Sequence, residues 1–169
     1  AYRCVSSIQR SREAPPEGEG LPCLRGAKIP KKGEQEMKGV ITEIERFSLK
    51  DGPGIRTTVF FKGCNMACKW CHNPESQSFD KQMMFYKDKC THCGKCIEVC
   101  PNSLKKCDFC GRGELYCPSD ARKICGKDYT VDEVFEEIIK DKAFYDNSGG
   151  GVTFSGGECM LQLDFLCEI

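Results

Sequence analysis

Three cysteines lie within eight residues near the middle of this chain, and their spacing restricts its fold more than any other feature. They are Cys64, Cys68 and Cys71, with the spacing C-x3-C-x2-C. A [4Fe–4S] cluster has four irons that are usually bound by thiolates, so three thiols on one loop leave one iron open. An open metal position can bind a substrate directly, as it does in catalytic metal sites. The loop therefore favours chemistry at a cluster over simple electron transfer.

A zinc loop is the alternative interpretation of the same three thiols. Zinc sites usually take C-x2-C pairs and four ligands. We therefore favour the iron–sulfur cluster, with Cys64, Cys68 and Cys71 as its ligands.

The number and grouping of the cysteines indicate a reducing environment. The chain has 169 residues and 15 cysteines, and ten of these fall in tight runs between Cys64 and Cys117. A disulfide scaffold is disfavoured because the count is odd and no signal peptide precedes the runs. We expect a cytoplasmic protein of an anaerobic cell.

Charge and hydrophobicity favour neither nucleic acid nor membrane as a partner. The formal net charge is zero, whereas nucleic-acid binding usually needs a basic surface. No apolar run approaches the roughly 20 residues that span a bilayer.

Composition divides the chain into four segments. Residues 1–36 are rich in Pro, Gly and charge without an apolar period, which predicts disorder. We expect them to be a leader that precedes a native start at Met37, with a genuine flexible tail as the alternative. Residues 37–79 and 127–169 show strand and helix patterns, and residues 80–126 form a cysteine-rich insert between them.

The first patterned segment predicts that the three-cysteine loop follows a buried strand. Residues 40–45 and 57–61 are β-branched or aromatic runs and are separated by a turn rich in Gly and Pro. The second run ends directly before Cys64. Ligand sites of α/β folds lie at the carboxyl ends of strands, so this position suits a functional loop.

The insert carries a ferredoxin-like repeat. Residues 90–101 follow the pattern C-x2-C-x2-C-x3-C-P, in which the fourth Cys binds the other of two clusters. Residues 107–118 match the same pattern except that Gly113 stands in place of the third Cys. The insert therefore predicts two cluster sites, one of which lacks a ligand.

Exchange of the fourth ligand assigns the thiols to two sites. The ligands of the complete cluster would be Cys90, Cys93, Cys96 and Cys117. The ligands of the impaired one would be Cys100, Cys107 and Cys110. The impaired site could hold three irons, could take Cys125 or water as a ligand, or could be empty. Cys125 as an ordinary small apolar residue is the simpler interpretation.

After the insert, the pattern becomes helical and then returns to a strand. Thr130 and Glu133 form a capping box in front of an apolar stripe that reaches Ile139. A strand is expected at residues 152–154, followed by the turn Ser155–Glu158. Gly156 and Gly157 in this turn would let the backbone approach a ligand closely, although an ordinary strand-to-helix turn is the alternative.

The elements outside the insert are too few for a complete α/β domain. About three strands and one and a half helices would leave one face of a parallel sheet uncovered. We therefore expect the chain to be a C-terminally truncated part of a longer protein.

These motifs support a family resemblance over residues 37–169. The three-cysteine loop, with Trp70 before its last Cys, resembles that of radical S-adenosylmethionine enzymes. Longer stretches are similar to one subgroup, the activating enzymes of glycyl radical enzymes, and these stretches are residues 47–56, 60–64, 70–77 and 149–158. The insert is similar to that of members that activate diol, choline, hydroxyproline or arylacetate enzymes. Two residues depart from the pattern: Gly113, and Cys159 in place of the usual Pro.

The resemblance implies a fold and an activity. The fold would be α/β, the N-terminal part of a partial (β/α) barrel with an inserted, mostly irregular ferredoxin-like domain. The open iron would bind S-adenosylmethionine, and one electron would cleave it. The resulting 5′-deoxyadenosyl radical would remove a hydrogen from a glycine of a partner glycyl radical enzyme. The electron would come from a low-potential donor such as flavodoxin or ferredoxin.

The resemblance also implies roles for individual residues. The turn that comprises Ser155, Gly156, Gly157 and Glu158 would contact the cofactor's amino group. Trp70 would pack against the cofactor, with a core role as an equal alternative. Asp51 and Arg56 would contact the partner's glycine loop, unless they are ordinary turn residues. A monomer is expected.

Two other functions remain compatible with the sequence: a radical enzyme that acts on a small molecule or peptide, and an electron carrier. The 169 residues alone are expected to be inactive. The sequence does not identify the glycyl radical enzyme that is served.

Overall fold

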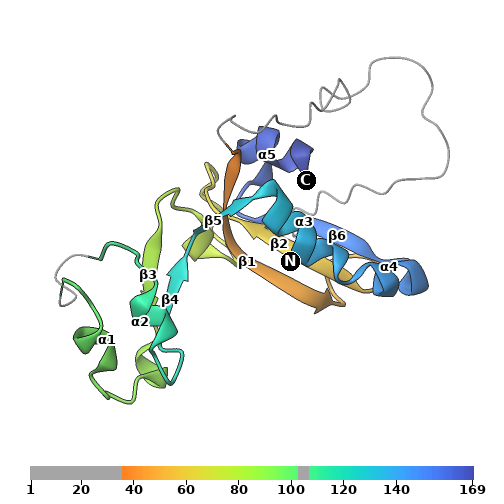
Figure 1. Cartoon of the computed structure of the whole chain (residues 1–169). Coiled ribbons are helices and arrows are strands. Elements are labelled where there is room, and N and C mark those ends of the chain that lie inside the picture. The colour runs from red at the N-terminus through yellow and green to blue at the C-terminus, as the bar shows by residue number, and fades with distance from the viewer. Residues whose placement is uncertain (1–35, 103–106) are drawn as a thin grey trace, which may run out of the picture.

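The computed structural model of the chain describes residues 36–102 and 107–169, so the expected leader lies outside the described residues apart from Glu36. The described residues form a four-stranded sheet with helices on it and a smaller lobe built on a two-stranded ribbon (Figure 1). This content confirms the α/β class.

The main sheet joins strands from both patterned segments. Its order is β5 (Lys127–Thr130), β1 (Lys38–Ser48), β2 (Arg56–Phe61) and β6 (Gly151–Gly156). β2 pairs parallel with β6 and antiparallel with β1, which also pairs antiparallel with β5. The strands expected at residues 40–45, 57–61 and 152–154 are confirmed, and β5 is an additional strand that the charged sequence at 127–130 did not indicate.

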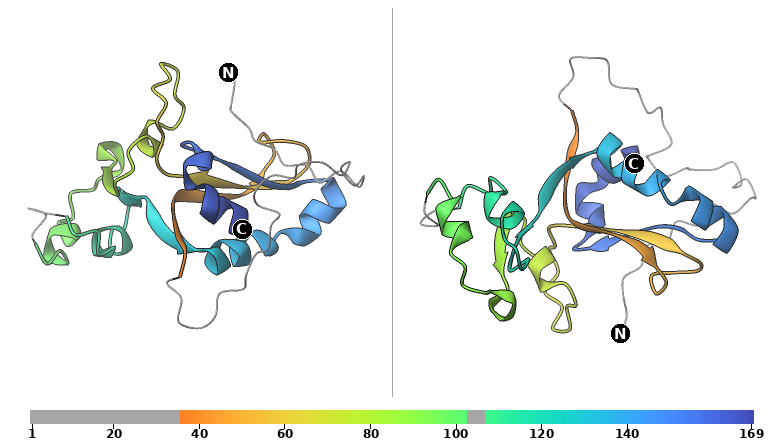
Figure 2. Two further views of the ribbon diagram at one scale, coloured as in Figure 1. Left: turned by 90° about the horizontal axis from the view of Figure 1, so that it is seen from above. Right: turned by 60° about the horizontal axis from the view of Figure 1, so that its bottom comes forward.

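Helices α3 (Val131–Ile139), α4 (Lys142–Ser148) and α5 (Leu163–Glu168) lie against this sheet (Figure 2). The capping box of α3 is confirmed, because Glu133 N donates to Thr130 Oγ1 at 3.2 Å and Thr130 N donates to Glu133 Oε2 at 2.8 Å. The 3-10 helix η4 (Cys159–Gln162) leads from β6 into α5.

One hydrophobic core holds these helices on the sheet. It consists of Ile41, Val59, Phe61, Val134, Ile138, Cys159 and Phe165. Only Val134 and Ile138 of the α3 stripe are buried, whereas Phe135 and Ile139 are 48% and 45% exposed. This helix of nine residues thus fully buries one i, i+4 pair against the sheet, and Val131 packs partly buried against the same core.

A buried polar cluster fixes α4 to the sheet. Asp141 lies between α3 and α4 in the sequence, and its carboxylate is fully buried. This carboxylate accepts hydrogen bonds from Arg46 Nε at 2.8 Å and Thr57 Oγ1 at 2.9 Å. Tyr145 OH donates to Thr57 Oγ1 at 2.6 Å. The hydrogen bond from Arg46 lowers the pKa of Asp141 below its usual value, because it favours the ionised form.

The smaller lobe is built from the cysteine-rich insert. β3 (Gln82–Phe85) pairs antiparallel with β4 (Arg122–Cys125), and the two short helices α1 (Lys95–Glu98) and α2 (Arg112–Leu115) lie between them in sequence. Two 3-10 helices, η2 (Pro74–Ser76) and η3 (Lys87–Lys89), precede β3 and follow it. β4 continues through Gly126 into β5, and this segment joins the lobe to the main sheet, as does the segment from β2 to β3 (Figure 1).

No helix among the described residues is both long and apolar enough to cross a membrane.

We expect Asp141→Asn to lower the free energy of unfolding at pH 7 by about 1–3 kcal/mol, because it removes a charge-assisted pair from a buried site. Since the folded-state pKa of Asp141 is depressed, its contribution is present above the unfolded pKa and is lost as the pH falls through the folded value. The variant should therefore lose less stability than the original chain on acidification below about pH 4.

Denaturant unfolding between pH 3 and 7 measures both effects. Asp146→Asn is the matched control on α4, because the Asp146 carboxylate is 64% exposed in its pair with Lys142 and should contribute about 0.5 kcal/mol or less. Equal effects of the two substitutions would contradict the assignment.

Candidate metal centre

The three-cysteine loop leaves the carboxyl end of β2, as the sequence predicted. Backbone hydrogen bonds fix its first residues on two sides. Lys62 N donates to Val40 O at 2.9 Å, Gly63 N to Ser76 O at 2.8 Å and Cys64 N to Gln77 O at 3.1 Å. The loop therefore begins from a rigid position between β1 and the segment that contains η2.

The three thiols of the loop are accessible. Cys64, Cys68 and Cys71 are partly exposed and are not in disulfides. Met66 N donates to Cys64 Sγ at 3.4 Å, so a backbone contact holds the first thiol of the loop. Trp70 is 70% exposed, so it does not pack in the core and its ring is available to a ligand.

The turn after β6 is joined directly to this loop. Gly157 N donates to Phe61 O at 2.8 Å, and Glu158 N donates to Gly63 O at 2.9 Å. A Cβ added at Gly157 would lie 2.2 Å from Gly63 O, so only glycine permits this approach. The sequence predicted a close approach of this turn to a ligand, and the structure shows a close approach to the base of the cluster loop.

Two polar side chains that the sequence analysis did not single out hold the same region together. Lys62 is only 2% exposed, and its Nζ donates to Glu75 O at 2.6 Å and Gln82 Oε1 at 3.1 Å. Gln162 Nε2 donates to Val40 O at 2.9 Å and Lys62 O at 2.8 Å. The sequence signal that could have indicated this cluster is Lys62 itself, a charged residue directly after the buried aromatic end of β2.

Asp51 and Arg56 lie inside the chain rather than on its surface, at 5% and 4% exposure. Ser48 Oγ and Thr58 Oγ1 donate to Asp51 Oδ2 at 2.7 and 2.8 Å. Arg56 Nε donates to Thr153 Oγ1 at 2.6 Å. These bonds hold the turn between β1 and β2 against β6, and the contact with a partner's glycine loop stays a prediction.

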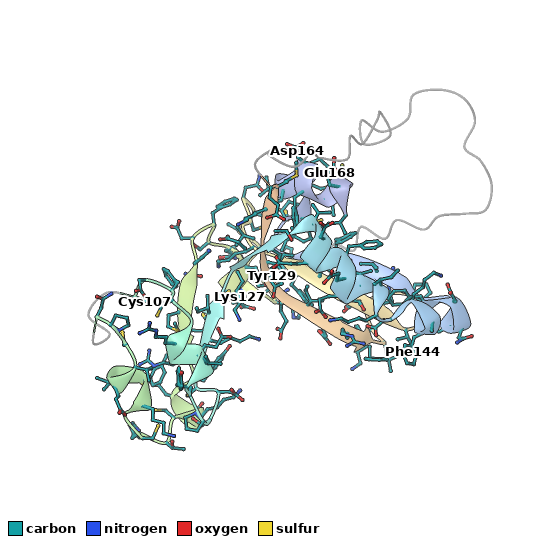
Figure 3. All side chains as sticks on the ribbon, viewed as in Figure 1. Cys107, Lys127, Tyr129, Phe144, Asp164 and Glu168 are labelled. Atoms are coloured by element: carbon teal, nitrogen blue, oxygen red, sulfur yellow. The ribbon has the colours of Figure 1, made fainter. Side chains whose placement is uncertain are left out.

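The lobe contains two cavities whose lining thiols match the two sets predicted from the exchanged ligands. The first has a volume of about 210 Å³, and its thiols are those of Cys90, Cys93, Cys96 and Cys117. The second has a volume of about 230 Å³, and its thiols are those of Cys100, Cys107 and Cys110. Gly113 lines the second cavity, and Cys125 lines neither. Figure 3 shows Cys107 on this lobe, away from Lys127 and Tyr129 on β5.

The two cysteine runs also share a backbone conformation. His92 and Phe109 have φ of 54° and 55°, and Gly94 and Gly111 have φ of 77° and 78°. Each glycine precedes a helix of four residues, α1 or α2. Left-handed conformations are rare outside glycine, so four matched positions show that the repeat in sequence is a repeat in structure.

The two cavities have groups that suit an anionic occupant. Arg122 lines both of them, and its Nε is buried without a hydrogen-bond partner among the described residues. The pKa of the Cys117 thiol is lowered, first by a backbone hydrogen bond from Ser119, and Ala121 N also donates to Cys117 Sγ at 3.2 Å. The chemistry of these donors fits thiolate-bound clusters.

In residues 36–102 and 107–169, no three His, Cys, Asp or Glu side chains converge closely enough to hold a metal ion. The assignment of ligands therefore depends on the position of the loop and on the lining of the two cavities.

A comparison with known families identifies the kind of metal group. Residues 50–169 match the family described as 4Fe-4S single cluster domain. The chain belongs to this family. A [4Fe–4S] cluster is thus the expected group of this 4Fe-4S domain, and the zinc alternative is disfavoured.

Curated relatives of this 4Fe-4S domain protein carry one kind of name. The chain is 46% identical over 147 residues to the benzylsuccinate synthase activating enzyme of Thauera aromatica. The aligned region covers 77% of this chain and 44% of the relative. It is 48% identical over 146 residues to the trans-4-hydroxy-L-proline dehydratase activating enzyme of Clostridioides difficile, with 79% and 48% covered. The (2S)-3-sulfopropanediol dehydratase activating enzyme of Klebsiella oxytoca is 43% identical over 152 residues, with 80% and 48% covered.

These relatives confirm the resemblance to activating enzymes of glycyl radical enzymes. The chain spans about half the length of the curated relatives that it matches.

We expect Gly157→Ala to destabilise the protein by about 1–3 kcal/mol, because its methyl group would overlap the backbone of Gly63. Displacement of the Gly63 backbone should also lower the amount of iron that the chain retains after anaerobic reconstitution. The control is Gly113→Ala, whose added Cβ would meet, among the described residues, only Arg122 Cδ within 4 Å, at 3.7 Å. If Gly157→Ala unfolds at the same denaturant concentration as the control, the junction is not rigid.

Proposed function

We propose that this chain contributes the cluster-binding part of an activating enzyme that generates a glycyl radical on a partner enzyme. When bound, the [4Fe–4S] cluster and S-adenosylmethionine would supply the electron transfer and the radical that removes the glycine hydrogen. Cys64, Cys68 and Cys71 would hold that cluster and leave one iron open to the cofactor. The names of the relatives support this assignment.

One observation carries the proposal: the three-cysteine loop and the Ser155–Glu158 turn share their attachment point. Both the residue before Cys64 and the end of β2 accept backbone hydrogen bonds from the turn. A cofactor on the open iron would therefore lie beside a backbone whose position is fixed relative to the loop. Pre-positioning of this kind lowers the entropic cost of reaching a reactive geometry.

Other chain groups would orient the cofactor and exclude water. The turn formed by Ser155, Gly156, Gly157 and Glu158 would contact its amino group. Glu158 is already oriented, because its Oε1 accepts Met160 N at 3.0 Å. The exposed ring of Trp70 would cover the cofactor when it is bound and shield it from solvent.

The lobe would supply the electrons or the docking surface. We propose that its first cavity holds a complete cluster bound by Cys90, Cys93, Cys96 and Cys117, and that its second cavity is a further cluster site. An external low-potential donor such as flavodoxin or ferredoxin would reduce them. The remaining strands of a partial (β/α) barrel would continue from the sheet, and the whole would act as a monomer in an anaerobic cytoplasm.

Asp51 and Arg56 would act on the partner indirectly in this proposal. Their side chains are committed to Ser48, Thr58 and Thr153, so they would set the shape of the turn between β1 and β2. The partner's glycine loop would then contact the turn that they hold.

The test of cluster chemistry uses the full-length protein with Cys68→Ala. We expect reductive cleavage of S-adenosylmethionine to 5′-deoxyadenosine to fall to background, because the cluster loses one of its three thiolates. Cys125→Ser is the control, since Cys125 lines neither cavity and a hydroxyl would keep a polar atom beside Lys62 Nζ, which donates to Cys125 Sγ at 3.7 Å. The yield of 5′-deoxyadenosine after reduction is measured by chromatography for both variants. Normal cleavage by Cys68→Ala would refute the assignment.

The test of the partner uses electron paramagnetic resonance. Full-length protein, reductant and S-adenosylmethionine mixed with a cognate glycyl radical enzyme should produce a glycyl doublet. Cleavage of the cofactor without a doublet on any candidate would favour a radical enzyme of small molecules or peptides. Failure to bind the cofactor would favour an electron carrier.

A further inference from the structure

The second cavity of the lobe differs from the first at one position. Cys96 is the second residue of α1, and Gly113 is the second residue of α2. Since the residues before these helices have the same φ values, Gly113 occupies the place that Cys96 has in the first cavity. The three thiols that line the second cavity therefore correspond to three of the four ligands of the first, and the fourth position is Gly113, which has no side chain.

The described residues leave space for a Cβ at that corner. Among residues 36–102 and 107–169, a Cβ added at Gly113 would meet only Arg122 Cδ within 4 Å, at 3.7 Å, which is an ordinary van der Waals distance. The φ of Gly113 is not in the left-handed region, so a side chain causes no backbone strain there. Glycine at this position is thus not required by the backbone, and the part of the chain that the structure describes leaves room there for a side chain.

Two neighbouring side chains limit what can close the corner. The carboxylate of Asp108 lines the same cavity, but its Oδ1 accepts Cys110 N at 3.2 Å, which holds it against its own loop. Arg122 presents a cation, stacked 4.8 Å from the Phe85 ring, and a cation does not bind iron. Its unpartnered Nε instead suits the sulfur atoms of an anionic cluster.

We propose that the second cavity is an iron–sulfur site held by three thiolates, those of Cys100, Cys107 and Cys110, whose fourth iron lies at Gly113 without a protein ligand. This iron would be bound by water or a small exogenous thiol and would be lost on mild oxidation. The inference depends on the proposed presence of clusters in the lobe, but not on the chemistry at the three-cysteine loop.

The test separates this iron from the open iron of the loop cluster. Full-length protein with Cys64→Ala, Cys68→Ala and Cys71→Ala is reconstituted anaerobically, so that only the lobe binds iron. It should hold about eight irons. When ferricyanide accepts one electron from the cluster of the second cavity and one Fe²⁺ leaves it, about seven should remain, with the paramagnetic signal of a three-iron cluster.

Gly113→Cys in the same background should close the corner. The iron count should stay at about eight after oxidation, and the three-iron signal should disappear. Gly113→Ala is the control that adds a Cβ without a ligand atom, and it should lose iron as the glycine chain does. Asp108→Ala should leave the loss unchanged.

Four results would overturn the proposal. A count of about four irons without the signal means that the second cavity is empty while the first cluster stands. A signal that persists in a folded Gly113→Cys chain places the open corner elsewhere, and a signal abolished by Asp108→Ala makes that carboxylate a ligand. A lobe that binds no iron refutes the proposed lobe clusters as well.

Discussion

The backbone junction at Gly63 is the interaction on which the candidate site depends. Here the end of β2, the segment around Ser76 and the turn at Gly157 exchange main-chain hydrogen bonds of 2.8–2.9 Å. Main-chain contacts of this kind require close approach, and a Cβ at Gly157 would prevent it. The spacing of the thiols would be of little use without this junction, because a loop attached to a mobile base cannot hold a cofactor in a fixed orientation.

Buried polar groups hold the other end of β2, on both faces of the sheet. On one face Asp141 joins β1, β2 and α4 through Arg46 and Thr57. On the other, Asp51 and Arg56 join the turn after β1 to β6. Each network satisfies groups that would be costly to bury alone. The parallel pairing of β2 with β6, which places the loop and the Ser155–Glu158 turn at one edge, is therefore specified by polar as well as apolar contacts.

Local signals in the sequence predicted the local structure correctly. The capping box at Thr130, the strand before Cys64 and the two cysteine runs each depend on residues a few positions apart. The contacts of Gln162 with Val40 and Lys62 span 122 and 100 positions, and the sequence contains no signal for them. The same reason explains β5, whose charged residues form a strand because β1 offers an unpaired edge. The sequence showed that Gly113 replaces a ligand of the second cluster site, but only the structure shows the space beside it.

The short strand β4 connects the lobe cavities to the base of the three-cysteine loop. Arg122, at its first position, lines both cavities, and Cys125, at its last, lies 3.7 Å from Lys62 Nζ at the base of the loop. Such a strand spans only about 13 Å. An occupant that orders one end of β4 would also favour order at the other end, so filling of the lobe cavities and folding of the three-cysteine loop would be linked equilibria. Loss of such an occupant would accordingly weaken the attachment of a loop that it does not touch.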